Sequence, residues 1–494
     1  MSKKSNKLQN TKLALLYVAP LALFFSYYPI IPLGSSASTN FELSLALIWL
    51  FLFSVLSLKD AILYIYNIYL AFLRQKAPKH ALPLLTLLFP LYLSLSVLWS
   101  PNPLRAVLTA GILWCLYISA IEITLLAKVK TLNRSLLTKV FLYGTASICL
   151  VCWLQSLLDT YGLSRETTLL CRGCTSLMFG FPHPSGFAIE PQFMGNLLLA
   201  PTLFVVYLSS RPQSPLKSSH LSLLFVFAST LFLTFSRGAI YSFAVAYLLF
   251  FVVSLATQKN RSIFKSLPVV VFSFLFTLAS QGVFAANSPT SDTFLSGVEK
   301  SLSQLSLGTI NLDLDSSNAL VSTSTESAIE ETPKAPETLI LVEDHASVFS
   351  GYVAESTDIR LNFSRIALEL ATSSPARFFF GTGLGSAGSV MYATGKTSSP
   401  KEIIQNQYLS LLLETGLLGL LFAALVVVYV IYIVKKTFSA PERLLLFSAL
   451  LSFALSLNFF AGLPNALHLY LFPVILSLFL PRRSKNKRVI NQEV

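Results

Sequence analysis

The sequence predicts an all-α polytopic membrane protein with about 12 transmembrane helices. Of its 494 residues, 54% are hydrophobic and only 12% are charged, and the mean hydropathy is +0.66. A soluble chain of this length could not cover its surface with so few charges. The net charge of +13 would suggest nucleic acid in a soluble protein, but in a membrane protein it reflects the basic bias of cytoplasmic loops. We therefore expect contact with membrane lipids and no nucleic-acid partner.

Apolar segments define the individual spans, because each crossing needs about 20 apolar residues. The first span is too long for a cleavable signal core of about 7–15 residues, so we expect a retained helix. A short apolar run at 61–73 is predicted to lie in the membrane interface. The predicted spans are 13–33, 41–58, 81–98, 106–127, 139–158, 192–209, 220–235, 238–257, 266–285, 408–434, 444–461 and 465–481.

Lysine and arginine positions predict the orientation of these spans. If both termini are cytoplasmic, the inner segments carry 25 of the 36 basic residues, and seven of the outer ones lie in the long segment 286–407. Long loops report orientation poorly. Without that segment the ratio is 25 inside to 4 outside. The count predicts cytoplasmic termini and places Arg237 on the outer face.

The spacing of the spans divides the chain into five parts. Residues 286–407 are acidic, with 14 acidic and 7 basic residues. There are no two matching halves of the kind many secondary transporters carry. The parts are an N-terminal bundle of about nine spans (1–285), a mobile acidic Ser/Thr-rich outer loop (286–344), a structured outer loop with an amphipathic helix (345–407), a three-span bundle (408–481) and a basic cytoplasmic tail (482–494).

The structured outer loop contains one predicted helix and a glycine-rich turn. Thr357 or Asp358 is expected to cap a helix that runs to about Thr372. The turn has glycines at alternate positions, Gly381, Gly383 and Gly385, which permit tight turns and close backbone approach. It lacks the flanking strand of a dinucleotide fingerprint. Between a hinge and a phosphate cradle, we favour the hinge.

Two arginines are the leading candidates for chemistry. Arg237 lies at the outer mouth of a span, where entry into the hydrocarbon core would cost about 2.5–3.5 kcal/mol, and its planar fork suits phosphate oxygens. Arg360 opens the predicted helix, where the backbone presents positive partial charge. Together they could hold a diphosphate. The alternative is that Arg237 snorkels to headgroups and Arg360 is a solvated charge; Arg365 and Arg377 are weaker candidates.

Three acidic residues lie in or near the membrane. Glu190 precedes a span on the outer side, where it could orient or deprotonate an acceptor hydroxyl, or simply be a helix-entry acid. Glu414 is assigned to helix packing. Glu122 falls near a span centre, where a carboxylate needs a partner, and the sequence supplies no explanation for it.

Cysteines and histidines indicate no metal or other cofactor. Cys171 and Cys174 share an outer loop and form either a strained disulfide or two free thiols. A lone cysteine pair is too small for a zinc site. The histidines in or near outer segments and spans are scattered: His183, His345 and His468.

Three ordered motifs together resemble the O-antigen ligase/polymerase superfamily of bacterial membrane glycosyltransferases. The resemblance extends in outline from about residue 80, where Trp99-Ser100-Pro101-Asn102-Pro103 also fits, and is sharpest over 220–420. The motifs are Ser236-Arg237-Gly238-Ala239; Arg360-Leu361 with Ala367-Leu368-Glu369-Leu370, Pro375 and Gly381-Thr382-Gly383-Leu384-Gly385; and Gln405-Asn406-Gln407-Tyr408-Leu409 leading into Leu413-Glu414-Thr415-Gly416-Leu417-Leu418-Gly419.

The resemblance implies a glycosyltransferase fold of the C type (GT-C) in the bacterial inner membrane. Such proteins take a glycan from an undecaprenyl-diphosphate carrier at the outer face and pass it to a saccharide or glycolipid acceptor, with inversion and without a metal or nucleotide sugar. Arg237 and Arg360 match the arginines that meet the donor diphosphate. Four further residues in or beside the motifs are expected to bind substrate: Arg365, Gly383, Asn406 and Tyr408.

One position departs from the ligase pattern. Ligases of the superfamily carry a His before the Asn of the third motif, and here that place is Gln405, which cannot act as a general base at neutral pH. This favours a polymerase, or moves the base to Glu190 or His345, or leaves an inactive member. The predicted catalytic residues are Arg237, Arg360, Glu190 and Gln405. The alternatives from other classes are a lipid-linked oligosaccharide flippase or other transporter, and a scaffold without turnover.

Overall fold

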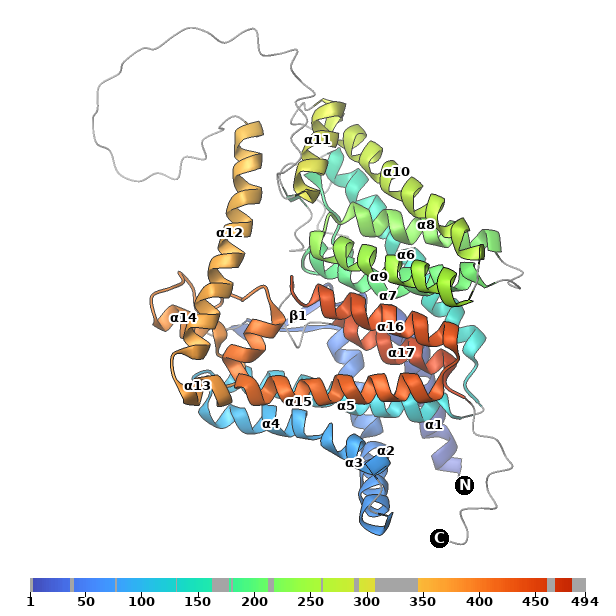
Figure 1. Ribbon diagram of the computed structural model, residues 1–494, viewed down its shortest axis with the longest axis vertical. Coiled ribbons are helices and arrows are strands. Elements are labelled where there is room, and N and C mark those ends of the chain that lie inside the picture. Colours follow the sequence, from blue (N-terminus) through green and yellow to red (C-terminus); the bar gives the residue numbers. More distant parts are fainter. Residues whose placement is uncertain are drawn as a thin grey trace.

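A computed structural model describes residues 3–35, 40–75, 78–129, 131–161, 177–178, 181–211, 217–258, 261–287, 293–306, 345–459 and 467–481. Helices dominate this part of the chain (Figure 1). They are α1 (Lys3–Ala22), α2 (Leu45–Gln75), α3 (Pro78–Leu85), α4 (Leu88–Ser96), α5 (Pro103–Ala127), α6 (Arg134–Thr160), α7 (Pro191–Ser210), α8 (Lys217–Leu233), α9 (Arg237–Gln258), α10 (Ser266–Ala286), α11 (Phe294–Leu305), α12 (His345–Thr372), α13 (Pro375–Phe380), α14 (Ala387–Ala393), α15 (Gln407–Thr437), α16 (Ala440–Ser456) and α17 (Leu471–Phe479).

Strands form two small antiparallel hairpins. The first pairs β1 (Ile30–Ser35) with β2 (Asn40–Ser44), and the second pairs β3 (Leu177–Met178) with β4 (Phe181–Pro182). Both follow a long helix in the chain. They connect helices and contribute no sheet layer to the fold.

Eight helical segments of the described chain are long and apolar enough to cross a membrane, and two shorter apolar helices, α8 and α17, accompany them. This confirms an all-α polytopic membrane protein. Each predicted span overlaps a described helix, while the total of about twelve stays a prediction. The eight segments are Leu45–Arg74, Ala81–Trp99, Pro103–Ala127, Arg134–Thr160, Pro191–Ser210, Arg237–Ala256, Ser262–Ala286 and Gln407–Thr437.

Two predicted boundaries near the N-terminus differ from the structure. The first helix ends at Ala22 rather than at residue 33, because the chain then turns into the β1–β2 hairpin. The run 61–73, expected in the interface, instead continues α2 without a break. That helix contains no glycine or proline to end it, and Asp60, which could have interrupted it, is paired with Lys12.

Helix α7 lies at the centre of the bundle, and 89% of the residues in its most apolar stretch are buried. It packs against α8, α9 and α16. A helix that is apolar on all sides is stable only where other helices surround it. Because α7 is fixed in this way, the residues at its start have a defined place at one end of the bundle.

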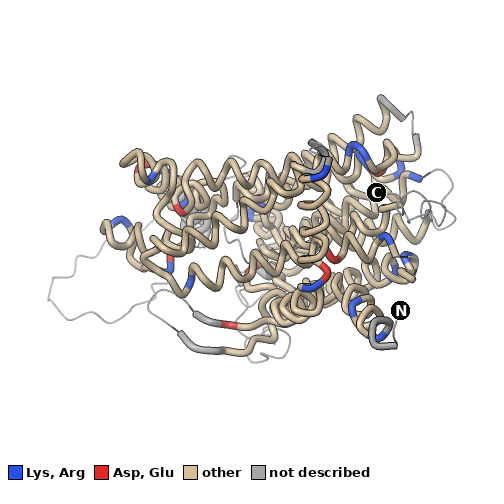
Figure 2. Tube along the Cα trace, turned by 90° about the horizontal axis from the view of Figure 1, so that it is seen from below, with Lys and Arg blue, Asp and Glu red and all other residues tan. Residues whose placement is uncertain are grey.

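Hydrogen bonds join separate segments of the chain at both ends of the bundle. At one end, the Arg134 guanidinium donates to the carbonyl of Ala127 at 3.2 Å and to that of Leu480. At the other end, the Gln407 amide donates to the Leu457 carbonyl at 2.9 Å, and Ser100 Oγ donates to the Leu384 carbonyl at 2.8 Å. Most charged positions lie towards the rims of the bundle (Figure 2). We call the end with Gln407 and Ser100 the site end.

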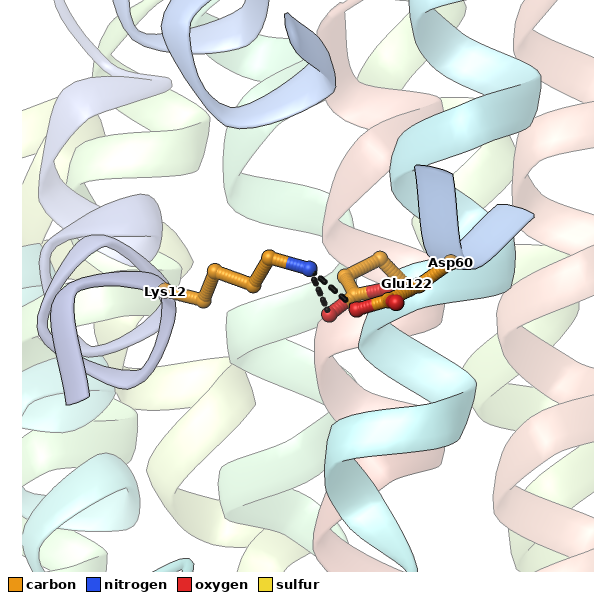
Figure 3. Close-up of polar contacts among 3 residues, drawn as sticks. All are labelled: Lys12, Asp60 and Glu122. Atoms are coloured by element: carbon orange, nitrogen blue, oxygen red, sulfur yellow. Dashed lines mark hydrogen bonds and ion pairs between the residues drawn. The ribbon is translucent and has the colours of Figure 1, made fainter. Parts of the chain in front are cut away.

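A charged cluster joins three helices, with Lys12 and Glu122 buried and Asp60 about half exposed. Lys12 Nζ of α1 lies 3.0 Å from Glu122 Oε1 of α5 and 2.5 Å from Asp60 Oδ2 of α2 (Figure 3). Lys12 and Glu122 are both 2% exposed. The cluster supplies the partner that the sequence could not name for Glu122, and it ties α1 to the neighbouring span helices.

The acidic segment 286–344 is only partly described. Residues 294–305 form α11, which packs on α10, with Gly297 so close that a Cβ would lie 2.5 Å from Ala285 Cβ. The composition of this stretch predicts a mobile loop, and the helix was not predicted, although Thr293 supplies its N-cap. Residues 307–344 lie outside the described chain.

Candidate active site

Arg237 is the first residue of α9, directly after the tight turn that ends α8. The turn contains Phe235 at φ 47°, a conformation that costs a non-glycine residue on the order of 1–3 kcal/mol. Ser236 begins the helix: its carbonyl accepts from Ile240 N at 2.9 Å, and its Oγ from Ala239 N at 3.4 Å. Arg237 is thus in the first turn, where the helix dipole favours an anion.

The start of α7 packs against this turn. Gly195 of α7 approaches α9 so closely that a Cβ would lie 2.9 Å from both Ala239 Cβ and Ser236 Cβ. Glu190 is the N-cap residue of α7, about one turn before Gly195. Glu190 and Arg237 therefore lie at the same end of the bundle.

The end of α16 completes this junction. Gln192 Nε2 donates to the Phe459 carbonyl at 2.8 Å, and a Cβ on Gly238 would lie 2.5 Å from Phe459 Cβ. The Phe459 ring remains 40% exposed beside these contacts. Sequence analysis missed Gln192 and Phe459, because nothing local in the sequence links residues 192, 238 and 459.

Arg360 interacts electrostatically with Glu190. Glu190 is exposed, yet desolvation by the surrounding protein raises the pKa of its carboxyl above the usual glutamate value, while the Arg360 guanidinium acts in the opposite direction. Two of the predicted catalytic residues, from segments 170 positions apart in sequence, are thereby brought together.

The predicted reason for Arg360 is wrong, although its placement supports a role. Helix α12 begins at His345 rather than at Thr357 or Asp358, so Arg360 lies inside the helix and receives no benefit from its N-terminus. The stretch before Asp358 has no proline to stop the helix, and it continues through the expected cap. The predicted end at Thr372 agrees with the structure.

The third motif lies beside the end of α16. The Gln407 amide bonds to Leu457, which places Gln405 next to the junction. Gln405 Oε1 is buried and has no hydrogen-bond partner among the described residues. Asn406 Oδ1 caps α15 by accepting from Leu409 N at 3.1 Å, and Tyr408 Oη donates to the Ala454 carbonyl at 2.7 Å. Both contacts give structural roles to residues predicted to bind substrate.

The glycine-rich turn uses backbone amides within the fold, which argues against a phosphate cradle, while the predicted hinge stays a prediction. The amides of Thr382 and Gly383 donate to the carbonyls of Leu413 and Glu414 at 2.9 and 2.8 Å. Gly383 has φ +98°, and a Cβ there would lie 2.4 Å from Ser100 Cα. Gly383 is therefore buried in a backbone junction and offers no amide to a substrate.

This junction meets α15 where the helix kinks. Gly416 inside α15 has φ 65°, which interrupts the helical backbone, and Tyr92 Oη donates to the Thr415 carbonyl at 2.8 Å. Glu414 Oε1 accepts from Ala387 N at 3.2 Å, and Arg105 lies within electrostatic range of Glu414. Glu414 has the packing role that the sequence predicted, in a junction that unites motifs far apart in the chain.

Arg365 is paired within its own helix, and its predicted role in substrate binding stays a prediction. Its Nε donates to Glu369 Oε1 at 3.0 Å, one turn further along α12, and its side chain is 80% exposed. Arg377 is also exposed and donates to Ser373 Oγ at 3.1 Å. The side chains of His345, Cys171 and Cys174 lie outside the described part of the chain, and within that part no cluster of three or more His, Cys, Asp or Glu residues could hold a metal.

The fold and this junction define a polytopic helical membrane protein in which Arg360 interacts with Glu190, while Arg237 lies at the same end of the bundle. Residues 222–424 match the family model described as O-antigen ligase. The match supports the resemblance to the O-antigen ligase/polymerase superfamily, and we call this segment the O-antigen ligase domain after the family model that it matches. Neither the search of curated proteins nor that of solved structures found a match. The domain includes Arg237, Arg360 and Gln405, whereas Glu190 precedes it.

Proposed function

We propose that this protein transfers a glycan from an undecaprenyl-diphosphate carrier to an acceptor sugar, acting as a polymerase. Membership of the O-antigen ligase family supports a glycan transferase. The observation that carries the proposal is the interaction of Arg360 with Glu190 at the end of the bundle that also holds Arg237. A cation pair beside an acid is what departure of a diphosphate and activation of a hydroxyl require.

The reaction takes place at the outer face of the bacterial inner membrane. With cytoplasmic termini, the basic residues divide 25 to 4 in favour of the inner side when the long loop is excluded, and Arg134 belongs to that side. The excess of positive charge marks the cytoplasmic side. The site end, with Arg237 and Glu190, then faces outward, where lipid-linked glycans are assembled further.

Arg237 and Arg360 bind the donor diphosphate. Each guanidinium presents a fork of N–H donors that matches phosphate oxygens, and the N-terminus of α9 adds positive partial charge at Arg237. As the bond from the sugar C1 to the phosphate oxygen breaks, negative charge grows on that oxygen. Interactions that strengthen with this charge lower the barrier to transfer.

Glu190 takes the proton from the acceptor hydroxyl. The acceptor oxygen then forms its bond to C1 on the face opposite the diphosphate, which inverts the configuration, and the departing diphosphate retains the bonding electron pair. The buried oxygen of Gln405 can accept a hydrogen bond from an acceptor hydroxyl, so this residue orients the acceptor without acting as the base. Neither step requires a metal or a nucleotide sugar.

The first test removes the arginines one at a time. Arg237→Ala and Arg360→Ala should each lower chain extension by about 10²–10³-fold, as loss of a transition-state donor does, while membrane insertion is unchanged. The assay mixes purified protein in proteoliposomes with a lipid-linked oligosaccharide and resolves product length. The matched control is Arg365→Ala, on the same helix but paired with Glu369 on the surface, and it should retain activity. Full activity in both test variants would remove the mechanism.

The same assay separates the competing functions. A ladder of lengthened glycans on the carrier indicates a polymerase, whereas transfer of one intact glycan to a glycolipid indicates a ligase. Movement of the donor across the vesicle membrane without a new glycosidic bond would support a flippase. If neither a new glycosidic bond nor movement of the donor is detected, the result would support a scaffold without turnover.

A further inference from the structure

We propose that Gln155 of α6 is a positioning residue that sets the place of Glu190 through the backbone of Gly186. The inference rests on the proposed function, since it assigns Gln155 a part in the work of Glu190. It concerns a residue that lies outside the O-antigen ligase domain and that no sequence motif marks.

Both ends of the Gln155 carboxamide bind the same residue. Its Nε2 donates to the Gly186 carbonyl at 2.7 Å, and its Oε1 accepts from the Gly186 amide at 2.9 Å. Gln155 is only 5% exposed, so water does not compete for these bonds. A paired donor and acceptor fix the orientation of a peptide segment as well as its position, much as one rung of a β-ladder does.

Gly186 fits tightly between α6 and α7. It has φ +61°, and a Cβ there would lie 3.2 Å from Met194 Sδ and 3.3 Å from Cys152 Sγ. The chain therefore has little room to settle elsewhere while the carboxamide bonds are intact. Glu190 follows only four residues later, at the N-cap of α7.

The rest of segment 183–190 is held at separate points. The Phe187 carbonyl accepts from the amides of Tyr27 and Tyr28, both at 3.0 Å. His183 Nε2 lies 3.2 Å from Gln304 Oε1, and its ring meets the edge of Phe235 in the turn before Arg237. Removing the Gln155 bonds would thus release the part nearest Glu190 without detaching the whole segment. This makes a local displacement, rather than unfolding, the expected consequence.

Displacement of Glu190 should affect proton transfer more than donor binding. In the proposed function the diphosphate is held by Arg237 and Arg360, whereas the two hydrogen bonds of the Gln155 carboxamide go to Gly186. A shift of about 1 Å in a reacting group can cost on the order of 10²-fold in rate. We therefore expect Gln155 variants to bind the carrier normally and to turn over slowly.

The test compares turnover with carrier binding in the full-length protein. Gln155→Met keeps the side-chain length but removes both bonds, and it should lower transfer per binding site by roughly 10–100-fold while binding of undecaprenyl diphosphate stays within about twofold. Gln155→Glu keeps an acceptor for the Gly186 amide but sets its second, acceptor-only oxygen against the Gly186 carbonyl, so it should lower turnover at least as much as Gln155→Met. The control is Thr145→Val, a buried α6 residue that bonds only to Phe141 of its own helix, and it should behave as wild type.

The outcomes separate this inference from the proposed function. If carrier binding and turnover fall together in Gln155→Met, the residue is merely structural and the inference is overturned. Unchanged turnover in Gln155→Met overturns it as well. If instead the unmodified protein neither binds undecaprenyl diphosphate nor transfers glycan, the proposed function fails first, and with it the basis of the inference.

Discussion

Arginines at the site end occupy two kinds of environment. Arg360 faces Glu190, whereas Arg365 is exposed and already paired with Glu369, and Arg377 is exposed beside Ser373. An exposed ion pair within one helix contributes only about 0.3–0.5 kcal/mol to stability, so the Arg365–Glu369 pair stabilises α12 only slightly. The position of each side chain, rather than its charge, therefore distinguishes Arg360, which interacts with Glu190, from Arg365 of the same helix.

The pH dependence of transfer should follow Glu190. Because desolvation raises the pKa of this carboxyl, the rate should increase with pH through a midpoint above the ordinary range of a glutamate. Arg360 lowers that pKa, so in Arg360→Gln the residual activity should show its midpoint at higher pH. The measurement is kcat/KM against pH, with Arg365→Gln as the control that leaves the midpoint in place. A midpoint that moves downward in Arg360→Gln would contradict the role of Glu190.

Among the helices and turns, the positions of helices could be predicted from local sequence, whereas contacts between distant segments could not. The apolar lengths predicted where helices lie, and Ser373-Ser374-Pro375 predicted where α12 ends. The start of α12 was not predictable, because a cap residue does not stop a helix whose preceding residues also favour it. The partners of the glycine-rich turn were also hidden, since Gly383 meets Ser100 across 283 positions of sequence.

The junction between the glycine-rich turn and α15 should be intolerant of side chains. Gly383→Ala would place a Cβ 2.4 Å from the Ser100 backbone in addition to its φ of +98°, and a buried clash of this kind costs typically 1–3 kcal/mol beyond the backbone strain. The control is Gly395→Ala, which shares a positive φ (+68°) but has open space around its Cβ. Thermal unfolding in detergent should show a clearly lower Tm for Gly383→Ala. Equal Tm values for the two variants would show that the junction is loosely packed.

Across the whole molecule, composition and charge predicted the membrane class and a consistent orientation, but not the contacts between distant helices. The catalytic candidates Arg237, Arg360 and Glu190 were found from their type and position, whereas the interaction of Arg360 with Glu190 and the packing of α7 on α9 depend on contacts between distant segments. The same limit applied to Glu122. Its partner, Lys12, lies 110 residues away on the first helix, and no pattern in the sequence connects them.

The cluster of Lys12, Asp60 and Glu122 should respond asymmetrically to substitution. Lys12→Met leaves the buried Glu122 carboxylate without its cation and should destabilise the fold by about 3–5 kcal/mol, while the half-exposed Asp60 adds little because water can solvate it. Glu122→Gln leaves one ion pair, Lys12 with Asp60, and should cost much less. Unfolding in detergent or resistance of α1 to protease reports the difference. Comparable losses in both variants would mean that the cluster holds the helices by packing alone.

The border of the O-antigen ligase domain falls between α7 and the arginines, since the match begins at residue 222 inside α8. A chimaera in which residues 222–424 are placed in another membrane protein would contain Arg237 and Arg360. It would lack Glu190 and the two hydrogen bonds between Gln155 and Gly186. Its recipient would have to supply an acid from its own preceding helix. Under the proposed mechanism, exchange of this segment in evolution would transfer the residues that bind the diphosphate without the residue that acts as the base.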